Sequence, residues 1–156
     1  MIIMVEFEVS IMTALREQAL HLVREIPEEN LTMLIEFLTG RTQSAIDERK
    51  KILGEFVEEL KKLYGENLKK VILYGSYARG DFRDNSDIDI IVLLNLDVTT
   101  IQERKKDLSA LTYDFGIAHN VEISAQSESY LHYIDWQKVH PLYQNIENDG
   151  VILYAD

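Results

Sequence analysis

Two aspartates separated by one residue are the first feature of this sequence that could support chemistry. Asp87 and Asp89 open the apolar run DIDIIVLL. Residues i and i+2 of a strand point to one face, so both carboxylates share a face while Ile88 and Ile90 point into the core. Two neighbouring carboxylates repel each other unless a cation lies between them, and Mg²⁺ prefers oxygen ligands. A solvated pair on an edge strand is the alternative interpretation.

A glycine and a serine follow the preceding apolar run. The segment Lys70 to Tyr74, KVILY, predicts a buried strand, and Gly75 then allows the backbone to turn tightly. Ser76 would open a short helix, where free backbone N–H groups and its hydroxyl could bind a phosphate. The alternative is a plain strand-to-helix turn capped by the serine.

A third acidic residue, Glu122, lies in a predicted strand over Val121 to Ala125. Strand alternation places Glu122 and Ser124 on one face and Val121 and Ile123 on the other. A neighbouring strand would then bring Glu122 beside the two aspartates. Three carboxylates can hold two metal ions, an arrangement that suits in-line phosphoryl or nucleotidyl transfer. A surface position is the alternative for Glu122 taken alone.

The elements that must position these residues alternate between helices and strands. Helical spacing begins after Ser10, a predicted N-cap, and is interrupted at Pro27. Such alternation predicts an α/β sheet with helices on at least one face. The remaining predicted elements are helices from Leu31 to Leu38, Ala45 to Tyr64 and Thr99 to Phe115, two helical pieces over 127–148 broken near Pro141, and a closing strand from Val151 to Tyr154.

The composition limits the classes of function. The chain has 156 residues, of which 46% are hydrophobic and 28% charged, so we expect one globular domain with a small appendage. It has no cysteine, which excludes a thiolate metal site and a cysteine nucleophile. The net charge of −11 disfavours direct nucleic-acid binding. No apolar run reaches the roughly 18 residues of a membrane span, and we expect a cytoplasmic protein.

The chemistry-bearing residues together resemble a known signature. Gly75-Ser76-x-x-Arg79-Gly80, then five residues, then Ser86-Asp87-x-Asp89, resembles the motif of the nucleotidyltransferases of the DNA polymerase beta superfamily. The short length and the lack of an evident substrate domain resemble its minimal members, the MNT (MntA-like) proteins. The resemblance covers about residues 45–156. It implies a nucleotidyltransferase domain of α/β (α+β) class, with a small mixed sheet and flanking helices, after an N-terminal helical hairpin over residues 1–42.

The resemblance also implies roles for particular residues. Mg²⁺ would be the cofactor and ATP the substrate. Arg79 would aid the phosphates, or instead lock the loop through backbone carbonyls. Glu122 occupies the place of a third carboxylate that helps to deprotonate the attacking hydroxyl, where family members often carry aspartate. The implied nucleotide-binding residues are Gly75, Ser76, Arg79 and Ser86, and the implied metal-binding and catalytic residues are Asp87, Asp89 and Glu122.

Minimal members are typically encoded beside a HEPN protein, with which they form toxin–antitoxin pairs. The resemblance therefore implies an antitoxin that transfers AMP from ATP to a tyrosine of a HEPN toxin. Two alternatives stay open: a non-catalytic module that neutralises its partner by contact, and a nucleotidyltransferase that modifies a small molecule such as an antibiotic. The N-terminal helices are each too short to be stable alone, so we expect them to pack on their own chain or to form a homo-oligomer or partner interface.

Overall fold

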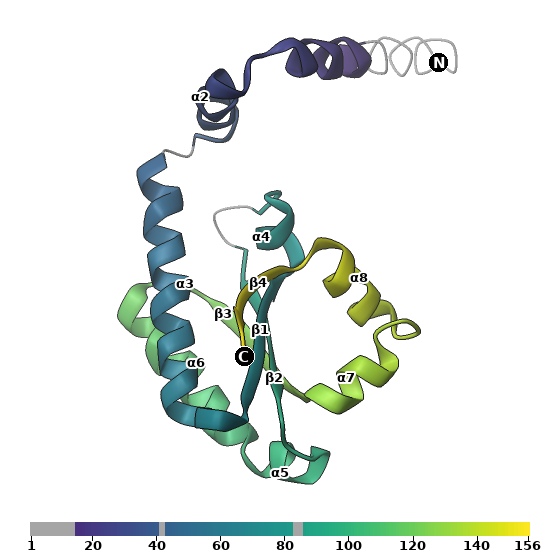
Figure 1. Cartoon of the computed structure of the whole chain (residues 1–156). Coiled ribbons are helices and arrows are strands. Elements are labelled where there is room, and N and C mark those ends of the chain that lie inside the picture. The colour runs from purple at the N-terminus through teal and green to yellow at the C-terminus, as the bar shows by residue number, and fades with distance from the viewer. Residues whose placement is uncertain (1–14, 41–42, 83–85) are drawn as a thin grey trace, which may run out of the picture. The chain divides into compact units, whose positions relative to one another are not determined.

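A computed structural model describes residues 15–40, 43–82 and 86–156 (Figure 1). The chain divides into two compact units, Met1–Arg49 and Lys50–Asp156. In the first unit, a helix covers residues 15–25 and α2 (Glu28–Thr39) follows Pro27, its N-cap. The predicted N-cap Ser10 lies outside the described residues. None of the helices in the described ranges is long and apolar enough to cross a membrane.

Four strands form one mixed sheet in the second unit. The strand order is β3-β2-β1-β4, with β1 antiparallel to both β2 and β4 and β2 parallel to β3. The predicted small mixed sheet is therefore confirmed. Because β3 lies at one edge, it pairs with a described strand on one side only. The strands are β1 (Leu68–Tyr74), β2 (Ile88–Leu94), β3 (Ile123–Ser129) and β4 (Val151–Ala155).

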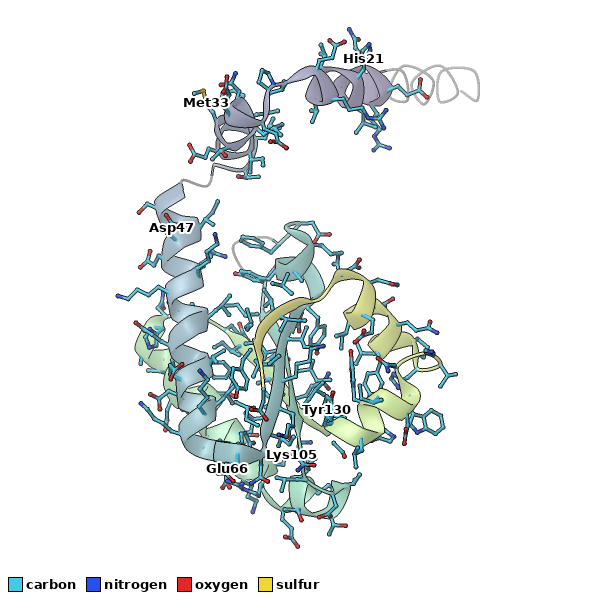
Figure 2. All side chains as sticks on the ribbon, in the orientation of Figure 1. His21, Met33, Asp47, Glu66, Lys105 and Tyr130 are labelled. Carbon is cyan, nitrogen blue, oxygen red and sulfur yellow. The ribbon has the colours of Figure 1, made fainter. Side chains whose placement is uncertain are left out.

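Helices cover both faces of this sheet, as Figure 1 shows. Strand alternation sends Val71 and Ile90 to a first core cluster with α3 and α6, and Ile72 and Ile91 to a second cluster with α7 and α8. Figure 2 shows Lys105 at the start of α6 and Tyr130 at the start of α7. The helices of this unit are α3 (Gln43–Tyr64, which begins in the first unit), α4 (Gly75–Arg79), α5 (Val98–Glu103), α6 (Lys105–His119), α7 (Tyr130–Trp136) and α8 (Pro141–Asp149).

The helix predicted over Thr99 to Phe115 is in fact two helices, α5 and α6, which meet at Arg104. The backbone of Arg104 leaves the helical region, with φ −87° and ψ 2°. Its guanidinium donates a hydrogen bond to the carbonyl of Leu63 at 3.0 Å and lies 4.9 Å from the ring centre of Tyr64. These contacts with α3 are tertiary, so the helical spacing of the sequence did not reveal the break.

The edge strand β3 is longer than predicted. It continues to Ser129, whereas the sequence predicted helix from residue 127. Its pairing with β2 runs through the register pair Leu94↔Ser129, so the partner strand holds these polar residues in extended form. Tertiary pairing here overrides the weak local preference of a short polar run.

Candidate active site

The site begins where β1 ends and α4 begins. Gly75 has φ +72°, a left-handed conformation that favours glycine. A Cβ atom at this position would lie 2.3 Å from Oδ2 of Asp89, which means that the backbone of Gly75 packs directly against that carboxylate. Ser76 is half-buried in the same turn, and its backbone carbonyl accepts hydrogen bonds from the N–H groups of Gly80 and Asp81. The predicted phosphate-binding turn therefore contacts the predicted metal ligand.

The two aspartates lie at the start of β2. Asp87 is exposed directly before the strand, and Asp89 is half-buried within it, opposite Tyr74 of β1. Burial raises the pKa of the Asp89 carboxyl, and the negative charge of Asp87 raises it further. The guanidinium of Arg79 opposes both effects on the pKa of Asp89. The two carboxylates and one cationic side chain thus interact electrostatically at one end of the sheet.

Glu122 lies directly before β3 and not within the strand that the sequence predicted over Val121 to Ala125, because β3 begins at Ile123. The backbone N–H of Ile88 donates to the carbonyl of Glu122 at 2.8 Å, and Asp89 is the register partner of Ser124. Glu122 and Asp87 each come directly before the first register pair, Ile88↔Ile123, so both lie at the same end of the sheet. Glu122 is exposed there. Within the described ranges, however, no three acidic or histidine side chains lie close enough together to hold one metal ion. The role of Glu122 as third ligand stays a prediction.

Arg79 and Ser86 flank the loop between α4 and β2. Arg79 is exposed, and its Nε donates to Oδ2 of Asp81 at 3.4 Å, which ties the end of α4 to the following residues. Ser86 is half-buried directly before Asp87. This hydrogen bond of Arg79 is with the carboxylate of Asp81, whereas the predicted loop-locking contact was with backbone carbonyls, and both roles of Arg79 stay predictions. The nucleotide-binding role of Ser86 stays a prediction.

Sequence reasoning did not identify a polar pair beside the aspartates. Nε2 of Gln126 in β3 donates to the hydroxyl of Tyr74 in β1 at 3.0 Å. Burial raises the pKa of Tyr74, and the charge of Asp89 raises it further. Gln126 shares the face of Glu122 and Ser124 by strand alternation, which is the sequence signal that could have found it. The bond joins side chains of β1 and β3 on the face that carries Asp89.

The donor set fits a hard divalent cation held by two ligands. Asp87 and Asp89 supply carboxylate oxygens, the donors that Mg²⁺ prefers, and Mg²⁺ usually binds through one or two carboxylates plus phosphate oxygens and water. The carboxylates of Asp87 and Asp89 repel each other, and Asp89 is half-buried. A cation between the two carboxylates would remove this repulsion. The arrangement therefore suits a metal bound together with a nucleotide triphosphate.

Comparisons with known proteins identify the family of this chain. The sequence profile of the nucleotidyltransferase domain family matches residues 53–142, which include every predicted site residue. The chain is 33% identical over 104 residues to "Putative protein adenylyltransferase MJ0604" of Methanocaldococcus jannaschii, covering 67% of this chain and 96% of that protein.

Two solved structures also resemble the chain. A crystal structure of "a putative nucleotidyltransferase from Sulfolobus solfataricus" is 27% identical with a TM-score of 0.47, covering 74% of this chain and 91% of that one. A chain in the crystal structure of a toxin–antitoxin with AMP-PNP is 22% identical with a TM-score of 0.43, covering 66% of this chain and 73% of that one.

Proposed function

Because this chain belongs to the nucleotidyltransferase domain family, we propose that it transfers AMP from ATP to a tyrosine of a partner protein, a HEPN toxin, and so acts as an antitoxin. The observation that carries the catalytic part is the contact between the Gly75 backbone and the Asp89 carboxylate, where an added Cβ would lie 2.3 Å from Oδ2. This contact supports the proposal that phosphate binds at the Gly75 turn next to a metal held by Asp89.

In this proposal, different residues bind the phosphates and the metal ion. The backbone N–H groups of the turn at Gly75 and the hydroxyl of Ser76 bind phosphate oxygens of ATP. Arg79 adds positive charge on the same side. Asp87 and Asp89 would hold Mg²⁺, which would screen the phosphate charge and make the α-phosphorus more electrophilic. Asp87 is exposed, so phosphate and water can approach its carboxylate.

The transfer step is an in-line displacement. The tyrosine oxygen forms a bond to the α-phosphorus as the bond between that phosphorus and the oxygen bridging to the β-phosphate breaks. Pyrophosphate leaves, and the hydroxyl proton passes to the carboxylate of Glu122. Glu122 is exposed on the edge side of the aspartate pair, so a hydroxyl of another molecule can reach it from solvent.

The acceptor class has separate support. A protein acceptor is supported by the relative from Methanocaldococcus jannaschii, whose name gives it as a protein adenylyltransferase. A HEPN toxin is proposed from the resemblance of about residues 45–156 to the MNT proteins. The acidic charge of residues 71–156 gives no reason to expect a nucleic-acid acceptor.

The decisive experiment labels the partner. The purified chain is incubated with Mg²⁺, α-labelled ATP and the HEPN protein encoded by a neighbouring gene, and the labelled tyrosine is located by mass spectrometry. The variant Asp87→Asn with Asp89→Asn keeps side-chain size but removes the metal-binding charge, so labelling should disappear. Asp135→Asn, an exposed aspartate of α7, is the matched control and should label normally.

Each other outcome has a defined meaning. Equal labelling by the wild type and the double variant would refute the enzymatic proposal. Loss of labelling with full neutralisation of toxicity would favour the contact-only module. Transfer of AMP to a small hydroxyl compound and never to protein would favour the small-molecule enzyme.

A further inference from the structure

The outer edge of β3 presents unpaired backbone groups. The N–H of Ile88 donates to the carbonyl of Glu122, which fixes the pattern of the parallel ladder. In that pattern alternate residues bond to the neighbour, so Glu122, Ser124 and Gln126 face β2. The N–H and C=O groups of Ile123 and Ala125 therefore point away from the sheet. Among the described strands, none pairs with this side of β3.

A groove runs along this edge, between β3 and the helices α5 and α6. The part near the start of β3, its upper part, has a volume of about 840 Å³ and is lined by residues of α6 and by residues 120–125. The part near the end of β3, its lower part, has a volume of about 260 Å³ and is lined by α5, the start of α6 and residues 125–128. Both parts share Ser109 and Ala125, so together they form one groove, the β3 groove, that follows the strand from end to end.

The helical wall of the β3 groove carries exposed apolar side chains among polar ones such as Ser109 and Thr112. Tyr113 and Ile117 of α6 line it with 69% and 65% of their surfaces exposed, and Val98 of α5 is 49% exposed. Ile123 and Ala125 face the same side, since both pack against the first core cluster. Unpaired backbone on one wall and apolar side chains on the other are the features by which a protein binds an extended peptide by strand addition.

The end of the β3 groove at Glu122 adjoins the candidate active site. Glu122 and Ser124 line the groove, and Ser124 is the register partner of Asp89. Neighbouring strands lie about 4.8 Å apart, so a strand added to β3 would lie roughly 10 Å from β2. Side chains on the added strand would alternate between the groove and the face that carries the aspartates.

We propose that the β3 groove binds an extended segment of the acceptor protein as a fifth strand, with the acceptor tyrosine on the aspartate face and its two sequence neighbours in the groove. This inference rests on the proposed transfer of AMP to a protein tyrosine. Because the neighbours meet Ile117 and Tyr113, they are small or apolar residues. The groove thus selects which tyrosine of the acceptor reaches Glu122.

The test measures binding and transfer separately. The probes are fluorescein-labelled peptides of about nine residues with a central tyrosine flanked by valine or alanine, and matched peptides with aspartate in the flanking positions. Binding to the full chain is measured by fluorescence anisotropy without ATP, and transfer is measured with ATP and Mg²⁺. The apolar-flanked peptides should bind about tenfold more tightly, a difference of about 1.4 kcal/mol.

Two variants and a control locate the binding. Ala125→Pro removes an outward N–H but no bond to β2, and proline is tolerated at such edge positions. Ile117→Glu puts a charge on the apolar wall at an exposed site where folding is not at risk. Each should weaken peptide binding about tenfold. Leu131→Glu, at a position of α7 that is 67% exposed and lies outside the groove lining, should bind peptide as the wild type does.

The outcomes separate this inference from the proposed function. Peptides that carry one N-methyl group should lose binding when the methylated residue is one of the alternate residues that bond to β3, and should bind normally when it is not. Loss of binding at every methylated position would overturn strand addition. Unchanged binding in both groove variants would overturn the docking site even if transfer is normal. Binding with the alternating pattern but no transfer would uphold the groove and defeat the proposed reaction. A wild-type dimer that Ala125→Pro converts to a monomer, with no peptide bound, would assign the edge to a second copy of the chain.

Discussion

At the scale of single residues, the most constrained position is Gly75. Its positive φ costs an L-residue about 1–2 kcal/mol, and an added Cβ would push against the Asp89 carboxylate. We expect Gly75→Ala to lower the free energy of unfolding by about that amount and to abolish AMP transfer, because Asp89 must move. Urea unfolding and the labelling assay check the two effects.

Gly54 provides a matched control for that substitution. It lies inside α3 with open space around its Cβ position and without a positive φ. Gly54→Ala should therefore raise the free energy of unfolding by roughly 0.5–1 kcal/mol and leave transfer unchanged. If Gly75→Ala behaved like Gly54→Ala, the contact with Asp89 would not matter to the site.

Glu122 is the residue whose role the geometry supports but does not fix. Glu122→Gln keeps the size of the side chain and removes the proton acceptor. We expect transfer to fall by about 10²–10⁴-fold, the usual contribution of a general base, with nucleotide affinity unchanged. Rates come from single-turnover labelling and affinity from titration with ATP. A rate within a factor of about two of the wild type would remove Glu122 from the reaction.

At the scale of elements, buried tyrosines attach α7 and α8 to the sheet. Tyr143 of α8 donates to Oε2 of Glu128 in β3 at 3.0 Å, and Tyr133 of α7 donates to Glu147 in α8 at 2.7 Å. Oε1 of Glu128 also accepts from the N–H of Ser129 at 2.7 Å, at the junction of β3 and α7. These bonds hold together the second core cluster, which lies on the same face of the sheet as Asp89.

Because these tyrosines are buried, we expect the free energy of unfolding to decrease at alkaline pH. Burial raises the pKa of Tyr143 from 10.0 to about 12, with a further contribution from its bond to Glu128. The folded state then keeps a proton that the unfolded state loses, so the stabilisation is complete below the unfolded pKa and is lost as pH rises from about 10 toward about 12. The melting temperature should fall through that window.

Tyr143→Phe tests this origin of the alkaline decline. At neutral pH the variant should lose about 1 kcal/mol, the net value of one hydrogen bond. As the pH rises from about 10 toward about 12, its melting temperature should fall less steeply than that of the wild type. An identical slope in the two proteins would assign the alkaline effect to other groups.

At the scale of the whole molecule, the N-terminal helices belong to a compact unit of their own, Met1–Arg49. No residue of α2 is buried, and Phe37 and Met33 are 84% and 69% exposed. The sheet and both core clusters lie within Lys50–Asp156. We therefore retain the proposal that residues 1–42 form a partner or homo-oligomer interface.

Deletion of residues 1–42 tests that proposal. Because α3 and the core remain, we expect the melting temperature to change by only a few degrees, roughly the effect of less than 1 kcal/mol. Solution mass or affinity for the HEPN partner should fall clearly. Unchanged mass and affinity with a much lower melting temperature would instead assign these helices to packing within their own chain.

Much of the site follows from the sequence because its signals are local. A glycine at a strand end and the alternation of Asp87 and Asp89 each depend on a few consecutive residues. Local backbone sterics fix which residues share a face, and apolar runs fix which strands are buried. The sequence therefore determined the α/β class, the turn at Gly75 and the shared face of the aspartates.

Tertiary structure decided what depends on residues far apart in the chain. The order β3-β2-β1-β4 put β3 at an edge and Gln126 within 3.0 Å of Tyr74, and the contact of Arg104 with Leu63 split one predicted helix into two. The backbone of Gly75 reached the Asp89 carboxylate only because β1 and β2 pair in one register. Such pairings depend on the summed burial and hydrogen bonding of whole elements, which no short window of sequence contains.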